Sequence, residues 1–567
     1  MSAHESLIAE LGDRLRSGKI SRRAFVRRLT ALGLATGAIA AALDAHAVPA
    51  SAAPAPGARA VTASGQNEST TLLIATSETP PGLDTEYDAS RSSHEGLGQT
   101  MDALVNFGKK KGADGLWYSD FSQLEGALAE SWDVTPDQKT VTFHLRKGVM
   151  SHWGNELTAN DVFYSWNRGY QLKSNRSFYY NFMKIKDPNS IKVLDKYTVR
   201  FEYEAPSSIA VVMHSNLYLT INDATAAKAH STAADPWAKN WIATNADGFG
   251  PYYVDTWQPG QQVIFRAHEG YWGGAPAIKE VIVREEPNPA NRLALIETGA
   301  VDVAEWLLPQ ELVQLKGNPN VQLALFRSNF QSTYEMNTLK PPFDNPKVRE
   351  AFKYAFPYND VLNTVFQGTA ERMRSLVPSV FPDNTEEYYT YETDLAKAKQ
   401  LLAEAGYPNG FKTELTYNTE IDWDESMAIL TQTNLKKIGV DATLSKLPGG
   451  PFFNAEWGHQ LTTCYFEDQP NVPAAEYALW AFGNTESRGD TTSWKNAQYD
   501  QLTTGALAEI DPVKRKAMNY QAQQIVAQDG PYVFIARPYY AWVMRPGITG
   551  ARWYPAEYVR WNEITKK

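Results

Sequence analysis

Apolar and polar residues alternate most clearly at residues 140–146. This period of two is typical of a strand that buries one face. A helical pattern follows, in which Val162 and Trp166 recur at helical spacing. Thr158 precedes it as a residue type that caps helix N-termini, and Asp161 places an acid in the first turn. The stretch therefore predicts a half-buried strand followed by an amphipathic helix.

The same two patterns recur along the chain. They predict strands at residues 71–76, 252–257, 262–266, 281–284, 301–304 and 411–418. They predict helices at residues 291–299, 394–406 and 427–439, and one more that begins at residues 344–346, where Pro346 falls in the first turn.

The N-terminus has the order of an export signal. Residues 21–27 read S-R-R-A-F-V-R, which is similar to a twin-arginine signal, and a weakly apolar segment follows at residues 29–43. That segment is too short for a membrane anchor. Small residues at 45–47, and again at 50–52, suit signal cleavage, so we expect residues 1–47 to be removed. The alternative is a cytosolic chain with a basic amphipathic helix at its N-terminus.

The segment behind the signal is rich in Ala, Pro, Gly and Ser, and it predicts a flexible tether over residues 48–70. No cysteine lies near the cleavage site, so we expect no lipid anchor and a soluble periplasmic protein. The one cysteine, Cys464, has no partner for an internal disulfide, and we expect a buried structural thiol rather than a catalytic nucleophile.

The net charge and the number of aromatic residues limit the kinds of molecule that the protein is expected to bind. The chain carries −10, and because residues 1–47 carry +3, the remainder carries −13. An acidic chain of this kind argues against nucleic acid and weakly favours cationic ligands. The 16 Trp, 29 Tyr and 23 Phe exceed what a core requires, which suggests that some rings line a large binding cleft.

Several ordered motifs resemble one family. Residues 128–168 contain L-A-E-S-W, then D-Q-K-T-V-T-F-H-L-R-K-G-V, then T-A-N-D-V-F-Y-S. Further along come G-P-Y at 250–252, Y-W-G-G at 271–274 and P-P-F-D-N at 341–345. From about residue 72 to 550, the chain resembles the solute-binding proteins of peptide-type ABC importers, bacterial extracellular solute-binding family 5. Ser151-His152-Trp153-Gly154 departs from the family's F-H-D-G.

The resemblance implies a fold in the α/β class: a two-lobed periplasmic binding protein with an extra subdomain on lobe one. We expect lobe one at residues 71–326, including a subdomain at about 98–235, lobe two at 327–531, and a return to lobe one at 532–567. The implied role is capture of a peptide or peptide-like solute. The implied partners are the ligand, the permease subunits of the importer and the twin-arginine export machinery, with the protein a monomer.

Family members bind the free amino group of their ligand with an acid on a lobe-two loop. Asp468 falls on that acid, since Tyr465-Phe466-Glu467-Asp468 matches the family's W-x-x-D. The alternative is that Asp468 only caps a turn and that Glu467 is a solvated surface acid. By the same resemblance, further rings border the cleft or belong to the core: Tyr465, Phe466, Trp423, Tyr417, Trp457, Tyr532, Phe534 and, in lobe one, Tyr87, which is followed by Asp88.

One departure bears on the ligand. Thr462 stands where some oligopeptide binders have an arginine that meets a peptide carboxylate. Arg372 and Arg374 are candidate substitutes, with exposed loop charge as the alternative. The ligand could therefore be an opine or other amino-acid conjugate, or an oligosaccharide, instead of a plain peptide.

A secreted hydrolase is the alternative from another class, and the chain lacks its usual motifs. We find no H-E-x-x-H, G-x-S-x-G, phosphate-binding loop or C-x-x-C. The nine His residues are scattered without metal-ligand spacing, so we predict no enzyme activity, metal or cofactor.

Overall fold

The computed structural model describes residues 68–88, 90–487 and 489–567, which fall in one compact unit. The predicted twin-arginine signal at residues 1–47 and the tether up to residue 67 lie outside the described residues. None of the described helices combines the length and the apolar character that a membrane span requires.

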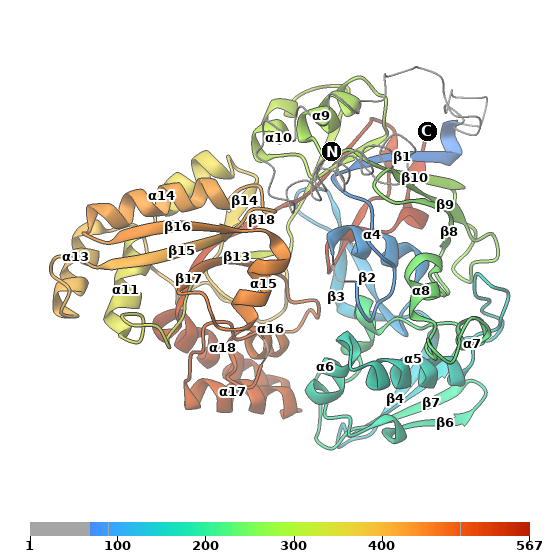
Figure 1. Cartoon of the computed structure of the whole chain (residues 1–567). Helices are drawn as coiled ribbons and strands as arrows, with labels where there is room; N and C mark the ends of the chain where they lie inside the picture. The colour runs from blue at the N-terminus through green and yellow to red at the C-terminus, as the bar shows by residue number, and fades with distance from the viewer. Residues whose placement is uncertain (1–67, 89, 488) are drawn as a thin grey trace, which may run out of the picture. The chain divides into compact units, whose positions relative to one another are not determined.

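A mixed seven-stranded sheet forms the first part of the fold (Figure 1). Its strands, in spatial order, are β12 (Gln322–Phe326), β19 (Tyr540–Met544), β11 (Val303–Glu305), β1 (Thr71–Thr76), β10 (Glu280–Glu285), β9 (Gln262–Ala267) and β8 (Tyr252–Gln258). Helices α4 (Arg91–Thr100), α8 (Lys239–Asn245), α9 (Pro289–Glu297) and α10 (Pro309–Leu315) accompany it. The hairpin β8–β9 confirms the pair of strands predicted around residues 252–266.

Two smaller four-stranded sheets extend this part. One contains β4 (Ala129–Val134), β5 (Thr140–Leu145), β7 (Thr198–Glu202) and β6 (Ile191–Asp195), with α5 (Ala159–Leu172), α6 (Asn175–Phe182) and α7 (Ala224–Ala229) in the same chain segment. The other joins β2 (Val105–Lys111) and β3 (Trp117–Gly126) to the C-terminal strands β21 (Arg552–Tyr554) and β22 (Tyr558–Val559). A two-stranded ribbon pairs β20 (Ile548–Thr549) with β23 (Thr565–Lys566).

The second main sheet has six strands: β14 (Ala370–Arg372), β18 (Tyr532–Pro538), β13 (Gln331–Met336), β17 (Thr463–Asp468), β15 (Lys412–Asn418) and β16 (Asp441–Leu447). Its helices are α11 (Pro346–Ala355), α12 (Tyr358–Asp360), α13 (Leu395–Glu404), α14 (Asp424–Lys437), α15 (Gly449–Trp457), α16 (Ala475–Gly483), α17 (Ala497–Ala508) and α18 (Pro512–Asp529). We call the residues up to 326 and from 540 onward lobe one, and residues 331–538 lobe two.

The chain crosses between the two main sheets at residues 327–330 and again at Tyr539. The hydroxyl of Ser328 donates to the carbonyl of Pro538 at 2.8 Å, which ties the two crossovers together. The predicted return at residue 532 is therefore wrong, because β18 still pairs with β13 and β14 in the second sheet. Every residue of β18 and most of β19 is buried, although Arg537 and Pro538 interrupt the apolar run just before the chain changes sheet.

The strand and helix predicted from the alternating pattern are both present. β5 alternates half-buried and buried positions along its length. Helix α5 begins after Thr158, whose backbone N–H and hydroxyl both donate to Asp161 Oδ2 at 2.7 Å. This reciprocal cap satisfies the first turn, as the sequence predicts.

Helix α5 also fixes the loop that enters lobe one after β1. Arg168 Nη1 and Nη2 donate to the two carboxylate oxygens of Asp84 at 2.7 and 2.6 Å, and both side chains are almost fully buried. Burial alone would lower the pKa of Arg168, but the bonds and charge of Asp84 outweigh it and raise the pKa. Two residues along, Arg176 of α6 pairs with Glu86 at 2.7 Å. The loop that leads to α4 is therefore held by two buried ion pairs.

Candidate functional site

Asp468 ends strand β17 beside the first crossover, where it pairs in register with Gln331 at the start of β13. Its side chain is half-buried and accepts one hydrogen bond, from the backbone N–H of Gln469 at 2.6 Å. Burial raises the pKa of Asp468 to about 6. Among the described residues, no Lys, Arg or His forms an ion pair with it. A carboxylate in this setting lacks a cationic partner.

The charge of Asp468 acts on tyrosines of both lobes. Burial is the main cause that raises the pKa of Tyr179 in α6 to about 12, and the charge of Asp468 adds to this effect. Burial, then the charges of Tyr179 and Asp468, raise the pKa of Tyr218 in lobe one and of Tyr477 in α16 well above the usual value. The acid of lobe two therefore acts electrostatically on tyrosines of lobe one.

Helices α6 and α16 bring the lobes into direct contact near this acid. The ring of Phe182 lies 5.0 Å from Trp480 and 5.2 Å from Tyr477, centroid to centroid. Ser208 of lobe one adds hydrogen bonds to Glu476 Oε1 at 3.0 Å and to the carbonyl of Leu507 at 2.9 Å. These contacts hold the lobes closed beside Asp468.

Glu467 lies on the other face of β17, inside lobe two. Its Oε1 accepts from Ser332 Oγ at 2.6 Å and from Trp423 Nε1 at 3.1 Å, while Oε2 has no partner. Burial raises the pKa of Glu467 to about 7, and burial together with the charge of Glu467 raises the pKa of Asp424 well above its usual value. Glu467 is therefore part of a buried carboxyl pair and not a solvated surface acid.

Arg91, the first residue of α4, is the cation of lobe one that faces these acids. Its guanidinium lies 4.7 Å from the ring of Trp306 and 4.7 Å from the ring of Phe330 in the crossover. Its charge acts to lower the pKa of Asp422, Glu467 and Glu557 against the larger effect of burial. No described carboxylate lies within ion-pair distance of it. Sequence analysis missed Arg91, although a cation in the first turn of a helix is electrostatically unfavourable and therefore a signal.

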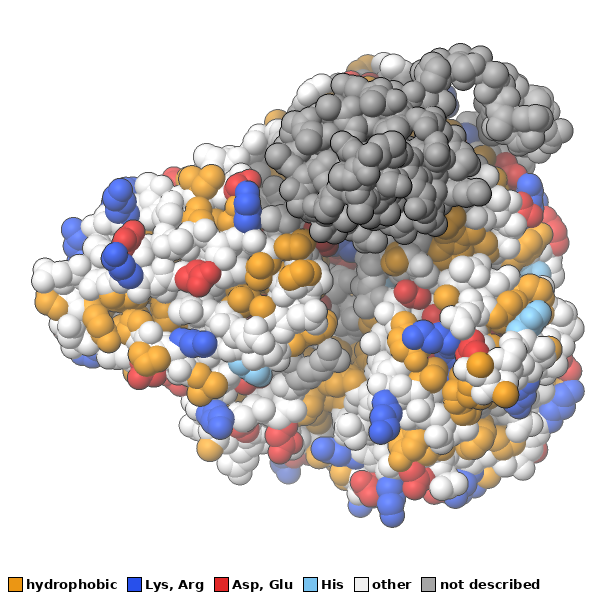
Figure 2. Space-filling view, in the orientation of Figure 1, with side chains coloured by type: hydrophobic (Ala, Val, Ile, Leu, Met, Phe, Trp, Pro, Cys, Tyr) orange, Lys and Arg blue, Asp and Glu red, His pale blue; other side chains and the backbone are white. Residues whose placement is uncertain are grey.

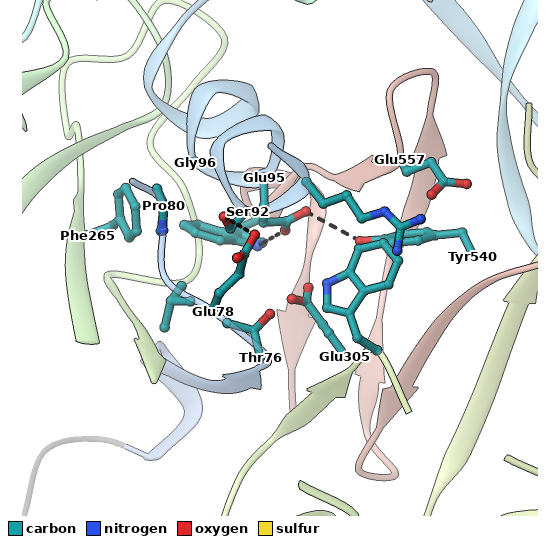
Figure 3. A pocket seen from close by; sticks show the side chains of 14 residues that line it. Thr76, Glu78, Pro80, Ser92, Glu95, Gly96, Phe265, Glu305, Tyr540 and Glu557 are labelled. Carbon is teal, nitrogen blue, oxygen red and sulfur yellow. Dashed lines mark hydrogen bonds between the residues drawn. The ribbon is translucent and has the colours of Figure 1, made fainter. Parts of the chain in front are cut away.

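A small pocket opens beside Arg91 in lobe one (Figure 3). Its lining combines rings with buried acids. Glu95 Oε1 accepts from Trp561 Nε1 at 2.8 Å, and Glu305 Oε1 accepts from Trp542 Nε1 at 2.7 Å. Burial, and then the charge of Glu305, raises the pKa of Glu95 well above its usual value. Rings and buried carboxyl groups therefore line the pocket, and burial favours the neutral form of Glu95.

Polar atoms without partners gather at the crossovers. They are buried side-chain oxygens of Asn329, Gln331, Gln469 and Asn471. Buried polar atoms in folded proteins are nearly always hydrogen-bonded. These oxygens can accept hydrogen bonds from a ligand with several N–H donors.

The remaining predicted rings lie mostly in the core of lobe two. Tyr465 donates to Thr431 Oγ1 at 2.8 Å, Tyr417 to Glu425 at 2.9 Å and Tyr532 to the carbonyl of Phe482 at 2.7 Å. Phe534 packs 4.7 Å from Tyr389, and Phe466 lies 6.4 Å from Phe482. All five side chains are buried, and the three tyrosine hydroxyls form hydrogen bonds inside lobe two. These rings therefore present almost no surface to a ligand.

Three other predicted side chains lie elsewhere. Trp423 meets Phe330 at 6.3 Å, at the crossover and close to the unpartnered atoms. Trp457 is 42% exposed at the end of α15, where it stacks on Phe453. Tyr87 is 40% exposed, with Lys239 Nζ 3.6 Å from its ring centre.

The two candidate arginines of lobe two are already engaged. Arg372 lies 3.6 Å over the ring of Tyr358 and donates to the carbonyls of Met373 and Ile535 at 2.8 and 3.1 Å. Arg374 pairs with Glu392 at 2.5 Å near the surface. Both arginines are therefore engaged within lobe two, whereas the charge of Arg91 acts on Glu467, the neighbour of Asp468 in the sequence.

Charged side chains of both signs are interspersed on the face of the molecule shown in Figure 2. No large basic patch is visible on that face, in line with the acidic composition.

Comparison with known proteins gives consistent matches. The family model described as bacterial extracellular solute-binding proteins, family 5 middle, matches residues 123–490. A dipeptide-binding protein of Escherichia coli is 26% identical over 84% of this chain and 91% of its own length, and heme-binding protein A of Haemophilus influenzae is 28% identical over 84% and 89%. The periplasmic binding protein DppA of Helicobacter pylori, solved with the peptide STSA, superposes with a TM-score of 0.76 at 26% identity, over 88% of this chain and 98% of its own.

Proposed function

This chain belongs to the bacterial extracellular solute-binding proteins of family 5, and we propose on this basis that it is the periplasmic binding component of an ABC importer. It captures a peptide or peptide-like solute between its lobes and delivers it to the permease. The observation that carries the proposal is Asp468, a half-buried carboxylate without a described cationic partner, at the crossover between the lobes. Export by the twin-arginine route, through Arg22 and Arg23, is part of the same proposal.

We propose that Asp468 binds the free amino group of the ligand. An ammonium–carboxylate bond is charge-assisted and stronger than a neutral one. Arg91 would meet a carboxylate or carbonyl oxygen of the ligand from lobe one. The unpartnered oxygens of Gln331, Gln469 and Asn471 would accept from its N–H groups. Because the ligand contacts both lobes, it would hold them closed, as hinged binding proteins do.

Thermal unfolding in the presence of ligand panels tests the class of solute. A ligand that binds only the folded state adds about 2.7 kcal/mol of stability at a hundred times its Kd, so the Tm rises with concentration. We expect shifts from dipeptides and tripeptides with a free N-terminus. A panel of opines and oligosaccharides serves as the contrast. No shift with peptides, together with a strong shift from that second panel, would reject the peptide proposal, and turnover of any ligand would favour a hydrolase.

The pH dependence of binding follows from Asp468. The pKa of the free carboxyl is about 6, so below pH 6 it is protonated and cannot pair with an ammonium group. Affinity should therefore fall about tenfold per pH unit below 6, and fall again above about 8, where an α-amino group loses its proton. Isothermal titration with a peptide from pH 4.5 to 9 measures this. The loss of affinity at low pH should be much smaller in Asp468→Asn than in wild type. This variant therefore distinguishes the titration of Asp468 from that of Glu467, whose pKa is about 7. Constant affinity between pH 4.5 and 7 would contradict the assignment.

A further inference from the structure

A second cluster of reactive side chains lies inside lobe two, away from the crossovers. It joins Glu335 of β13, Glu456 of α15 and Cys464 of β17, and one ligand atom from each lies within 4.8 Å of the others. The pairing of β13 with β17 places Glu335 directly opposite Cys464. Cys464 Sγ lies 3.7 Å from Glu456 Oε1. No motif spacing links these residues, so the sequence alone does not reveal the cluster.

The negative charge of this cluster has no compensation in the described part of the chain. The three residues are 4%, 2% and 5% exposed, and none takes part in an ion pair there. The Thr491 hydroxyl donates to Glu335 Oε2, but Glu456 Oε2 has no partner at all. Leaving such groups ionised and unpaired in the interior is costly. They must therefore either hold protons or share a cation.

The cluster lines a small pocket, about large enough for one water molecule or one ion. Asn337, Thr463 and Thr492 contribute polar groups to its wall, and the half-buried Leu461 and Thr462 bound it on the side nearer the surface. The unpartnered Glu456 belongs to this wall. The pocket therefore offers an ion a set of donors.

We propose that Glu335, Glu456 and Cys464 form a binding site for one divalent transition-metal ion, with Zn²⁺ as the best fit. One thiolate and two carboxylates suit a borderline-soft ion, whereas Ca²⁺ and Mg²⁺ take oxygen ligands only. Three protein ligands leave a fourth position, which can take water. The ion would link β13, β17 and α15 within lobe two.

Metal binding displaces the protons that the cluster otherwise carries. Burial raises the pKa of Glu335 to about 8 and raises the pKa of Glu456 and Cys464 well above their usual values. All three groups give up a proton to solvent when the ion binds, so affinity should rise with pH.

Cobalt titration of the metal-free protein tests the site directly. Cys464 is the only cysteine of the chain, so a sulfur-to-cobalt charge-transfer band can arise only there. We expect the band to saturate at one Co²⁺ per chain, to disappear on addition of Zn²⁺ and to be absent in Cys464→Ser. A featureless titration of the wild-type protein would overturn the proposal.

Carboxylate variants provide a second test, in which the affinity for Zn²⁺ is measured by competition with a chromophoric chelator. Loss of an outer-shell partner costs metal sites about 10–100-fold in affinity, so Glu456→Gln, which removes a ligand, should cost at least that much. Glu414→Gln, an exposed carboxylate on the neighbouring strand β15, is the matched control and should bind like wild type. Thermal unfolding of the metal-free variants shows whether each is folded. Equal Zn²⁺ affinity in wild type and in folded Glu456→Gln would also overturn the proposal.

Discussion

Asp468→Asn is expected to weaken binding of a ligand with a free amino group by about 2–5 kcal/mol, because truncating one member of a desolvated charge pair leaves the other unpaired. The carboxylate has no described protein cation and one backbone hydrogen bond, so the amide changes little in the free protein. Isothermal titration with a peptide identified in the thermal screen measures the loss, which corresponds to a Kd increase of about 30-fold or more.

The N-acetylated form of the same peptide makes this prediction specific. Acetylation removes the ammonium group, so it should weaken binding to wild type but have little further effect in Asp468→Asn. This non-additivity is the signature of a direct pair. Asp441→Asn, which removes an exposed carboxylate from lobe two, is the control and should bind like wild type. Equal affinity of Asp468→Asn and wild type would reject the assignment of Asp468.

Asp84→Asn is expected to lower the free energy of unfolding by about 3–5 kcal/mol, because it leaves the guanidinium of Arg168 buried and without its partner. The wild-type pair is bidentate and almost fully buried. Chemical denaturation followed by fluorescence measures the change. Since Asp84 anchors the loop that leads to Arg91, the variant should also bind ligand more weakly.

Glu404→Gln provides the matched control for this prediction. Its partner is Lys347 at 2.8 Å, but both side chains are largely exposed. Exposed ion pairs contribute little to stability, so this variant should unfold like wild type. If Asp84→Asn were as stable as Glu404→Gln, the buried pair would not hold the loop.

Local patterns were enough to predict much of the fold. The cap at Thr158, the alternation along β5 and the proline that starts α11 are each decided by residues within a few positions. The change of sheet after Pro538 is different. Arg537 and Pro538 precede it, but both are buried in β18, and the pairing of β18 with β13 places it.

The candidate site was harder to predict than the fold. Asp468 was placed by family motif, but its setting depends on Tyr179 and Tyr218, which lie some 250 to 290 residues away in the sequence. The family resemblance left open which rings border the cleft and which belong to the core. Tyr465 and Phe466 point to opposite faces of β17, and helices cover both faces. Arg91 has no motif, and its role depends on contacts with Trp306 and Phe330.

The identity of the ligand that the protein carries when isolated from its native periplasm tests the central claim most directly. Ligand released by denaturation and analysed by mass spectrometry should be a peptide or peptide-like molecule with a free amino group, at up to one molecule per chain. An oligosaccharide or another solute without an amino group would contradict the claim that Asp468 selects the ligand.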